Sequence, residues 1–322
     1  MLRLLMLGTG PFAVPTFQSL LASPHQVLAL VTQPTVADAG RRKAIAAPMR
    51  DAAVAARVPI MDPEDVNDPA SVQALAAWHA DLLVVCDYGQ ILSPELLALP
   101  PLGAINLHGS LLPAYRGAAP INWALLDGCT QTGVTVAHIT PKLDSGPVLV
   151  QRTTAIGPTE DAVQLEARLA QLGVAAVHEA IALLAAWDRR TPLGTPQDAQ
   201  RATRARRLRK SDGEADWSRS ARQLYDQVRA LKPWPGTFTT WRRSPSQEMR
   251  LILEQVSVVE ESAIAGAAPP GTVVRAEKRL LHIATGAGLL SLDRVQPAGK
   301  RVMPIDEFLR GHSLQPGNRL GA

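Results

Sequence analysis

The sequence predicts an α/β domain with an open, Rossmann-like, mostly parallel sheet, followed by a small C-terminal β-barrel of the OB-like type. In the first half of the 322 residues, short apolar runs alternate with helical patterns. A stretch rich in Pro, Thr, Gln and Arg at residues 189–211 then interrupts both patterns, and several short β-like runs with Gly and Pro turns follow it. Alternating strands and helices are typical of a parallel sheet with right-handed crossovers, whereas closely spaced short strands favour a barrel.

The elements of the first domain follow from apolar runs and helical periodicity. Buried strands are predicted for five runs, at residues 2–7, 27–32, 82–85, 104–107 and 134–139. Helical patterns cover residues 11–21 and 69–79, and a long amphipathic helix covers residues 159–187. Thr159 is the expected N-cap of the long helix, because the two acidic residues that follow it suit the positive end of the helix dipole.

The second half of the chain predicts a different architecture. One helix is expected at residues 218–231. Short strands are expected at residues 236–241, 249–259, 271–275, 280–284 and 289–292. We therefore divide the chain into an α/β domain at 1–189, a basic linker at 190–210 and a β-barrel domain at 211–322.

The composition limits the class of protein. Hydrophobic residues make up 46% and charged residues 19% of the chain, which is typical of a globular protein. No apolar run approaches the roughly 20 residues that cross a bilayer, and the N-terminus lacks a signal-peptide pattern, so a cytoplasmic protein without a membrane partner is expected. Its two cysteines, Cys86 and Cys129, can build neither a disulfide framework nor a four-thiolate zinc site. The net charge of +4 permits a polyanionic partner.

The first apolar run enters a glycine turn that has the form of a dinucleotide-binding fingerprint. Gly8, Gly10 and Ala13 occupy the three positions of G-x-G-x-x-A. A true dinucleotide site needs an acidic residue roughly 20 positions further on, at the end of the second strand, to bind the ribose. Here that strand ends without a carboxylate. We therefore interpret the motif as a tight turn between a strand and a helix, and expect no NAD.

Three polar residues point to acyl-transfer chemistry. Asn106 and His108 lie two residues apart at the end of a predicted strand, so their side chains share one face. Asp144 follows the 134–139 strand, also at its carboxyl end, where ligands bind to open parallel sheets. An amide can donate to an oxyanion, and an imidazolium beside a carboxylate can protonate a leaving amine. With no obvious nucleophile, direct attack by the acceptor is favoured; on the residues alone, a structural role for the histidine stays open.

The segments NLHGSLLP (106–113), YRGAAP (115–120), TGVT (132–135) and LDSG (143–146) together resemble the signature of the folate-dependent formyltransferases. The resemblance implies that Asn106, His108 and Asp144 are the catalytic trio. It also implies a 10-formyltetrahydrofolate donor, with no metal, that contacts Ser110, Leu111, Leu112 and Pro113. In this family, the stretches that match residues 90–92 and 140–143 line the folate pocket.

Other segments suggest the acceptor of the formyl group. Residues 6–21, 215–238, 295–303 and 316–320 resemble the family members that act on methionyl initiator tRNA, so the resemblance runs from Leu2 to Leu320. It implies a C-terminal barrel that helps to hold the tRNA. A basic loop of the family matches loosely here, and a tRNA role is carried over only to Arg41, Arg42 and Lys43. Arg116 is either a structural clamp or a phosphate contact. A monomer is expected.

Two alternatives remain. The chain could formylate a small amine such as an amino sugar nucleotide, which predicts weak, salt-insensitive interaction with tRNA. It could also be a relative that binds RNA without catalysis. The presence of all three catalytic residues argues against the second alternative.

Overall fold

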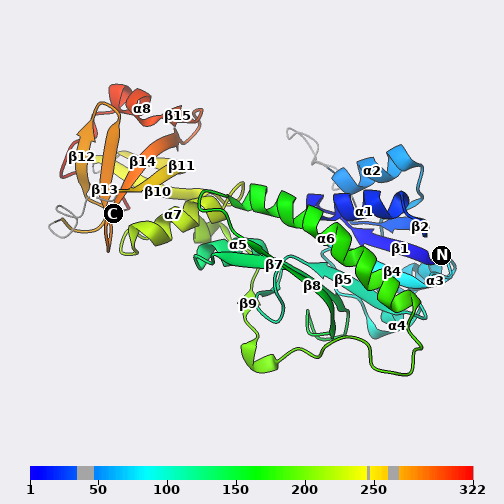
Figure 1. Cartoon of the computed structure of the whole chain (residues 1–322). Helices are drawn as coiled ribbons and strands as arrows, with labels where there is room; N and C mark the ends of the chain where they lie inside the picture. Colours follow the sequence, from blue (N-terminus) through cyan, green and yellow to red (C-terminus); the bar gives the residue numbers. More distant parts are fainter. Residues whose placement is uncertain (35–46, 245–246, 260–267, 322) are drawn as a thin grey trace. The chain divides into compact units, whose positions relative to one another are not determined.

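The computed structural model describes residues 1–34, 47–244, 247–259 and 268–321. The chain divides into two compact units, each of which draws on three stretches of the sequence (Figure 1). Unit 1 comprises residues 1–121, 130–156 and 164–206. Unit 2 comprises residues 122–129, 157–163 and 207–322.

Unit 1 is built on a seven-stranded sheet with the order β3-β2-β1-β4-β5-β7-β8. Its strands are β1 (Arg3–Gly8), β2 (Gln26–Val31), β3 (Ile60–Met61), β4 (Leu82–Cys86), β5 (Ala104–His108), β7 (Gln131–His138) and β8 (Val148–Ala155). The first five pair in parallel, whereas β7 and β8 are antiparallel. The expectation of an open, mostly parallel sheet is confirmed.

The direction of β7 corrects one step of the sequence argument. In the pairing of β5 with β7, His108 lies opposite Thr135 and Ile105 lies opposite His138, so the carboxyl end of β7 lies beside the start of β5. The segment between the two strands does not cross back to the amino end of the sheet, and β7 therefore runs antiparallel. The end of β7 therefore does not lie at the carboxyl edge of the parallel strands. Asp144 reaches that edge, beside Asn106 and His108, because the loop that follows β7 turns back toward it.

Helices flank this sheet. They are the 3-10 turn η1 (Pro11–Ala13), α1 (Val14–Leu21), α2 (Pro48–Ala56), α3 (Pro69–Ala76), α4 (Pro94–Leu97), α6 (Ala162–Ala185) and the 3-10 turn η2 (Ala199–Arg201), whereas α5 (Pro120–Leu126) belongs mostly to unit 2. A small parallel pair, β6 (Arg116–Gly117) with β9 (Arg204–Ala205), lies outside the main sheet. The helix that we expected at 159–187 begins at Ala162, so Thr159 is not its N-cap.

The long helix α6 packs closely on the sheet. A Cβ added at Gly173 would lie 2.5 Å from the side chain of Leu107 in β5, so only glycine permits this approach. The apolar side chains of Leu165, Leu169 and Ile181 are fully buried. Among the described helices, α6 is the one that is long and apolar enough by composition to cross a bilayer, although charged residues interrupt its apolar runs. Burial of its apolar face against the sheet accounts for that composition.

Unit 2 contains the antiparallel sheet predicted for the C-terminal half. Its strands pair in the order β10-β11-β14-β13-β12, and β15 pairs with β14. The elements are the 3-10 turn η3 (Lys210–Gly213), α7 (Ala221–Ala230), β10 (Thr237–Ser244), β11 (Gln247–Val259), β12 (Val273–Glu277), β13 (Leu280–Ala284), β14 (Leu289–Pro297), β15 (Met303–Pro304) and α8 (Ile305–Gly311). Ser220 and Gln223 form a capping box at the start of α7.

The last residues of the chain join the two edges of this curled sheet. Leu320 N donates to Gly271 O beside β12, at 2.8 Å, and Gly321 N donates to Thr240 O of β10, at 2.7 Å. The Leu320 side chain is 2% exposed and belongs to the core of the unit. The C-terminal segment thus completes a half-closed barrel by pairing with both of its edge strands.

Candidate active site

The amide, imidazole and carboxylate that the sequence singled out meet in unit 1. Asn106 and His108 extend from one face of β5. Asn106 Nδ2 lies 3.5 Å from Asp144 Oδ1, and His108 Nδ1 lies 3.8 Å from Asp144 Oδ2. The His108 and Asp144 side chains are 6% and 9% exposed. Both distances are long for hydrogen bonds, so the amide and the imidazole keep capacity to bind a further group.

The contacts of His108 define where its exchangeable proton lies. His108 Nε2 is 2.9 Å from the backbone carbonyl oxygen of Tyr115. A carbonyl oxygen can only accept, so Nε2 carries a proton and donates. The other nitrogen, Nδ1, faces the carboxylate of Asp144 at 3.8 Å and makes no closer contact with it. The ring is therefore oriented to hold and release a proton at Nδ1.

Asp144 is held by its surroundings in an unusual backbone conformation. Its φ is 48°, in the left-handed region, and its Oδ2 accepts from Gly117 N at 2.8 Å. The loop that carries it is braced internally, because Ser145 Oγ donates to Lys142 O at 2.7 Å. The loop also lies tightly against β7: a Cβ at Gly146 would collide with His138 O. The carboxylate is therefore fixed relative to β5.

The four residues that the resemblance assigned to the folate donor lie directly after His108. Ser110 is fully buried and its hydroxyl donates to Ala114 O at 2.6 Å. Leu112 is buried, and its amide donates to Thr135 Oγ1 at 3.0 Å. Leu111 and Pro113 are half-buried. In this segment the two buried residues shape the loop, and the other two have surface left for a ligand.

Arg116 and Gln197 form a contact that the sequence did not predict. Arg116 Nη2 and Nε donate to Gln197 Oε1 at 2.7 and 3.2 Å. Gln197 Nε2 in turn donates to the carbonyl oxygens of Asp144 and Gly146 at 2.9 and 2.8 Å. Arg116 is thus engaged as a clamp. No motif marked Gln197, which lies in a stretch with the composition of a linker. Tyr115 and Gly117 lie in the YRGAAP motif, but they act through backbone groups, whose roles residue types do not reveal.

The glycine turn after β1 is occupied by the chain itself. Thr9 N and Gly10 N donate to Asp87 O at 3.0 and 3.4 Å, so the amides that would cradle a pyrophosphate are used. The Asp87 carboxylate lies against the turn, because a Cβ at Gly10 would be 1.7 Å from Asp87 Oδ2. Removal from water and the nearby Glu166 carboxyl raise the pKa of Asp87 to about 6. An acidic group here disfavours a phosphate, which supports the interpretation as a structural turn.

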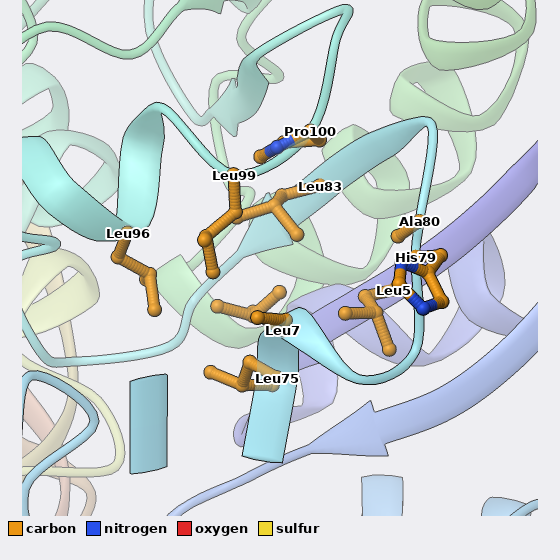
Figure 2. Close-up of a pocket in the computed structure, with 10 residues that line it drawn as sticks. Leu5, Leu7, Leu75, His79, Ala80, Leu83, Leu96, Leu99 and Pro100 are labelled. Atoms are coloured by element: carbon orange, nitrogen blue, oxygen red, sulfur yellow. The ribbon is translucent and has the colours of Figure 1, made fainter. Parts of the chain in front are cut away.

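A separate apolar cavity of about 240 Å³ lies between β1, β4, α3 and α4 (Figure 2). Its lining includes Leu5, Leu7, Leu75, Leu83 and Leu96. None of the predicted site residues lines it. His79 is the one titratable side chain in its lining, which offers no side-chain amide or carboxylate to act beside it.

Two further expectations concern ions and tRNA. Within the described ranges, no group of three or more His, Cys, Asp or Glu side chains could hold a metal ion. Arg41, Arg42 and Lys43 lie outside the described residues.

Comparison with known proteins places these features in context. Family models described as "Formyl transferase" and "Formyl transferase, C-terminal domain" match residues 2–181 and 207–313. A methionyl-tRNA formyltransferase from Rhodopirellula baltica is 42% identical, with 99% of this chain and 96% of the relative aligned. Among solved structures, an N-formyltransferase from Helicobacter canadensis aligns with a TM-score of 0.64 at 14% identity, covering 91% of this chain and 99% of that chain. HypX from Aquifex aeolicus aligns with a TM-score of 0.62 at 17% identity, covering 96% of this chain and 48% of its own.

Proposed function

This chain belongs to the formyl transferase family, and we propose that it transfers the formyl group of 10-formyltetrahydrofolate to the α-amino group of methionyl initiator tRNA. The products are formyl-methionyl-tRNA and tetrahydrofolate. The observation that carries the proposal is the convergence of Asn106, His108 and Asp144, in a chain that resembles a methionyl-tRNA formyltransferase along 99% of its length. The reaction belongs to translation initiation, and we propose that the protein acts in the cytoplasm.

Each of the three side chains has a distinct role in the proposed reaction. Asn106 donates a hydrogen bond from Nδ2 to the oxyanion that forms when the amine attacks the formyl carbon. His108 gives the proton on Nδ1 to the departing folate nitrogen, while its Nε2 stays bound to the Tyr115 carbonyl. Asp144 stabilises the imidazolium and accepts the proton of the attacking amine through water. The methionine amine is neutral in sufficient amount near pH 7 to attack directly.

The surface around the trio suits a flat, partly apolar donor. Ile91 and Leu143 are 69% and 54% exposed, which is unusual for large apolar side chains. Both belong to stretches that line the folate pocket in relatives, and neither is explained by packing within unit 1. We assign residues 110–113 to one wall of the donor pocket, where Leu111 and Pro113 supply apolar surface and Ser110 and Leu112 hold the wall in place.

Exposed cations support a nucleic acid as acceptor. The segment 201–210 buries Ala205 and Leu208, and it exposes six basic side chains, namely Arg201, Arg204, Arg206, Arg207, Arg209 and Lys210. Together with Arg41, Arg42 and Lys43, these residues are the proposed phosphate contacts. The division of labour that we propose assigns catalysis to residues 1–189, phosphate binding to the basic side chains of the linker at 190–210, and tRNA binding to the barrel at 211–322.

The test is formyl transfer from 10-formyltetrahydrofolate to methionyl initiator tRNA, with uncharged tRNA and an amino sugar nucleotide as parallel acceptors. We expect transfer to the charged tRNA alone. Its KM should rise steeply with salt, since each phosphate contact adds about 0.7–0.9 to the slope of log K against log salt. Transfer only to the small amine, without salt dependence, would show that the proposed acceptor is wrong. No transfer to any acceptor from folded protein would show that the proposed activity is wrong.

A further inference from the structure

The segment that follows α6 returns to the loop that follows β5 and His108. Thr195 and Val148 exchange two backbone hydrogen bonds of 2.8 Å, which tie the segment to β8. Ten residues on, β9 pairs with β6. Between these anchors, Thr203 accepts from Tyr115 N through its Oγ1 at 2.8 Å and from Arg116 N through its carbonyl at 2.9 Å. Both ends of the segment are therefore fixed to unit 1.

Gln197 lies between these anchors, and the orientation of its amide is unambiguous. Arg116 has only donors, so the group facing its guanidinium must be the amide oxygen. The carbonyls of Asp144 and Gly146 can only accept, so the group facing them must be the amide nitrogen. The half-buried amide makes four hydrogen bonds between 2.7 and 3.2 Å.

These contacts close a ring around the catalytic carboxylate. Starting from the Asp144 carbonyl, the ring runs through the Gln197 amide to the Arg116 guanidinium. The next residue of the chain, Gly117, returns to Asp144 by donating its amide to Oδ2. The Asp144 main chain is thus held by Gln197, which Arg116 of β6 contacts, and its side chain is held by Gly117, the next residue of β6. Hydrogen bonds linked in this way strengthen one another when partly buried.

We propose that Gln197 is a positioning residue for Asp144 in formyl transfer, an inference that rests on the proposed function. By holding the carbonyls on both sides of Ser145, it keeps Asp144 in its left-handed conformation and its carboxylate beside Asn106 and His108. Gln197 touches neither the trio's reactive atoms nor, in this proposal, a substrate.

The chemistry of the position explains why glutamine is required. A glutamate could accept from Arg116 but would direct a carboxylate oxygen at two carbonyl oxygens. A methionine of similar length would fill the space and offer neither the donor nor a strong acceptor. Loss of the amide would let the loop relax, and a misplacement of about 1 Å at a reacting group can cost about 100-fold in rate.

The first experiment compares Gln197→Met with Gln200→Met, using formyl transfer to methionyl initiator tRNA and thermal unfolding. Gln200 lies three residues further on in the same segment and is exposed. We expect Gln197→Met to lower kcat by about 10- to 100-fold, with both KM values within about threefold of the parent. Gln197→Glu should lose activity similarly, although it keeps the acceptor for Arg116 and with it the anchoring of the segment. Gln200→Met should match the parent enzyme.

A double-mutant cycle with Asp144→Asn, followed by single-turnover kinetics, separates positioning from a general structural role. If Gln197 acts through Asp144, Gln197→Met should lower the single-turnover rate of formyl transfer little further in a chain that already carries Asp144→Asn. Full additivity of the two losses would overturn the inference, as would a kcat for Gln197→Met within twofold of the parent. A parent enzyme that does not formylate methionyl-tRNA would instead overturn the proposed function, so the two failures are distinguishable.

Discussion

At the scale of single residues, a few side-chain atoms around Asp144 define the chemistry. Asn106 and His108 come from β5 and Asp144 from the loop after β7, and backbone groups complete their arrangement. The Tyr115 carbonyl selects which nitrogen of His108 exchanges its proton, and the Gly117 amide holds one oxygen of Asp144. The reactive positions are thus set by hydrogen bonds of the loop that follows β5.

The role of His108 leads to a prediction about turnover. His108→Ala should lower kcat by about 100- to 10,000-fold, the range of a lost general acid, with a melting temperature near that of the parent. His138→Ala is the matched control, because that histidine packs against Trp187 with ring centroids 6.1 Å apart and should change kcat by less than about threefold. Steady-state formyl transfer measures both. Near-parent turnover of His108→Ala would show that the assigned mechanism is wrong.

Asp87 leads to a prediction about pH. Its pKa is raised from 3.8 to about 6, so the folded chain binds a proton that the unfolded chain has already released in that interval. The contribution of Asp87 to the free energy of unfolding is therefore greatest below pH 3.8, and this contribution is lost as the pH rises to about 6. Asp87→Asn removes the ionisation, so it should raise the melting temperature more at pH 8 than at pH 4.5.

The control for this prediction is Glu64→Gln, a neutralisation at an exposed position. Its change in melting temperature should be the same at both pH values. If Asp87→Asn stabilised the protein equally at pH 4.5 and pH 8, the raised pKa would be refuted.

At the scale of elements, α7 carries a buried ion pair that organises unit 2. Asp226 and Arg229 are 4% and 6% exposed, and Arg229 Nε donates to Asp226 Oδ1 at 2.7 Å. Arg229 also donates to the carbonyl of Glu160, at 3.1 Å, in a stretch that lies far away in the sequence. Arg222 donates to the other oxygen of Asp226 from a side chain that is 56% exposed. One helix thus fixes a distant loop through a buried cation.

Removal of the buried partner should therefore be far more costly than removal of the exposed one. Asp226→Ala leaves Arg229 charged and buried without compensation, and should lower the free energy of unfolding by about 3–5 kcal/mol. Arg222→Ala removes an exposed pair and should cost less than about 1 kcal/mol. Urea denaturation of the two variants tests this order. Equal effects would mean that the Arg229 charge is solvated in the folded protein.

At the scale of the whole molecule, each unit depends on stretches of chain that are far apart in sequence. The catalytic unit includes residues 164–206, which follow its last strand, and the barrel includes residues 122–129 and 157–163. The barrel also requires the last residues of the chain, which bond to both of its edge strands. Local sequence therefore accounts for the elements, and distant segments complete the units.

This closure by the C-terminal segment can be tested by truncation. Deletion of residues 317–322 should lower the stability of unit 2 by at least about 3 kcal/mol, because it exposes two strand edges and removes the buried Leu320. Leu320→Ala alone should cost about 2–5 kcal/mol. Gln315→Ala, at an exposed position just before the segment, is the control. A truncated chain with parent stability would show that the edges do not need this segment.

The sequence by itself determined most of the elements and the fold class, and it singled out Asn106, His108 and Asp144, whose catalytic roles stay a prediction. Apolar runs and turn residues marked β1, β2, β4 and β5 and the five barrel strands, because each is a local pattern with its own periodicity. The trio was recognisable because three side chains with acid, base and donor chemistry lie in an ordered motif. Residues 41–43 were singled out in the same way, and their tRNA role stays a prediction.

Only the tertiary structure decided the direction of β7, the bracing of Asp144 and the closure of the barrel. Strand direction depends on where the chain re-enters the sheet, which apolar periodicity does not encode. The segment around Gln197 has the composition of a linker, yet its polar side chains and backbone bond to the loop that follows β5 and to the loop that carries Asp144. The physical reason is common to all three. They rest on hydrogen bonds between segments distant in sequence, often to backbone groups, and such bonds leave no periodic signal in the residues that make them.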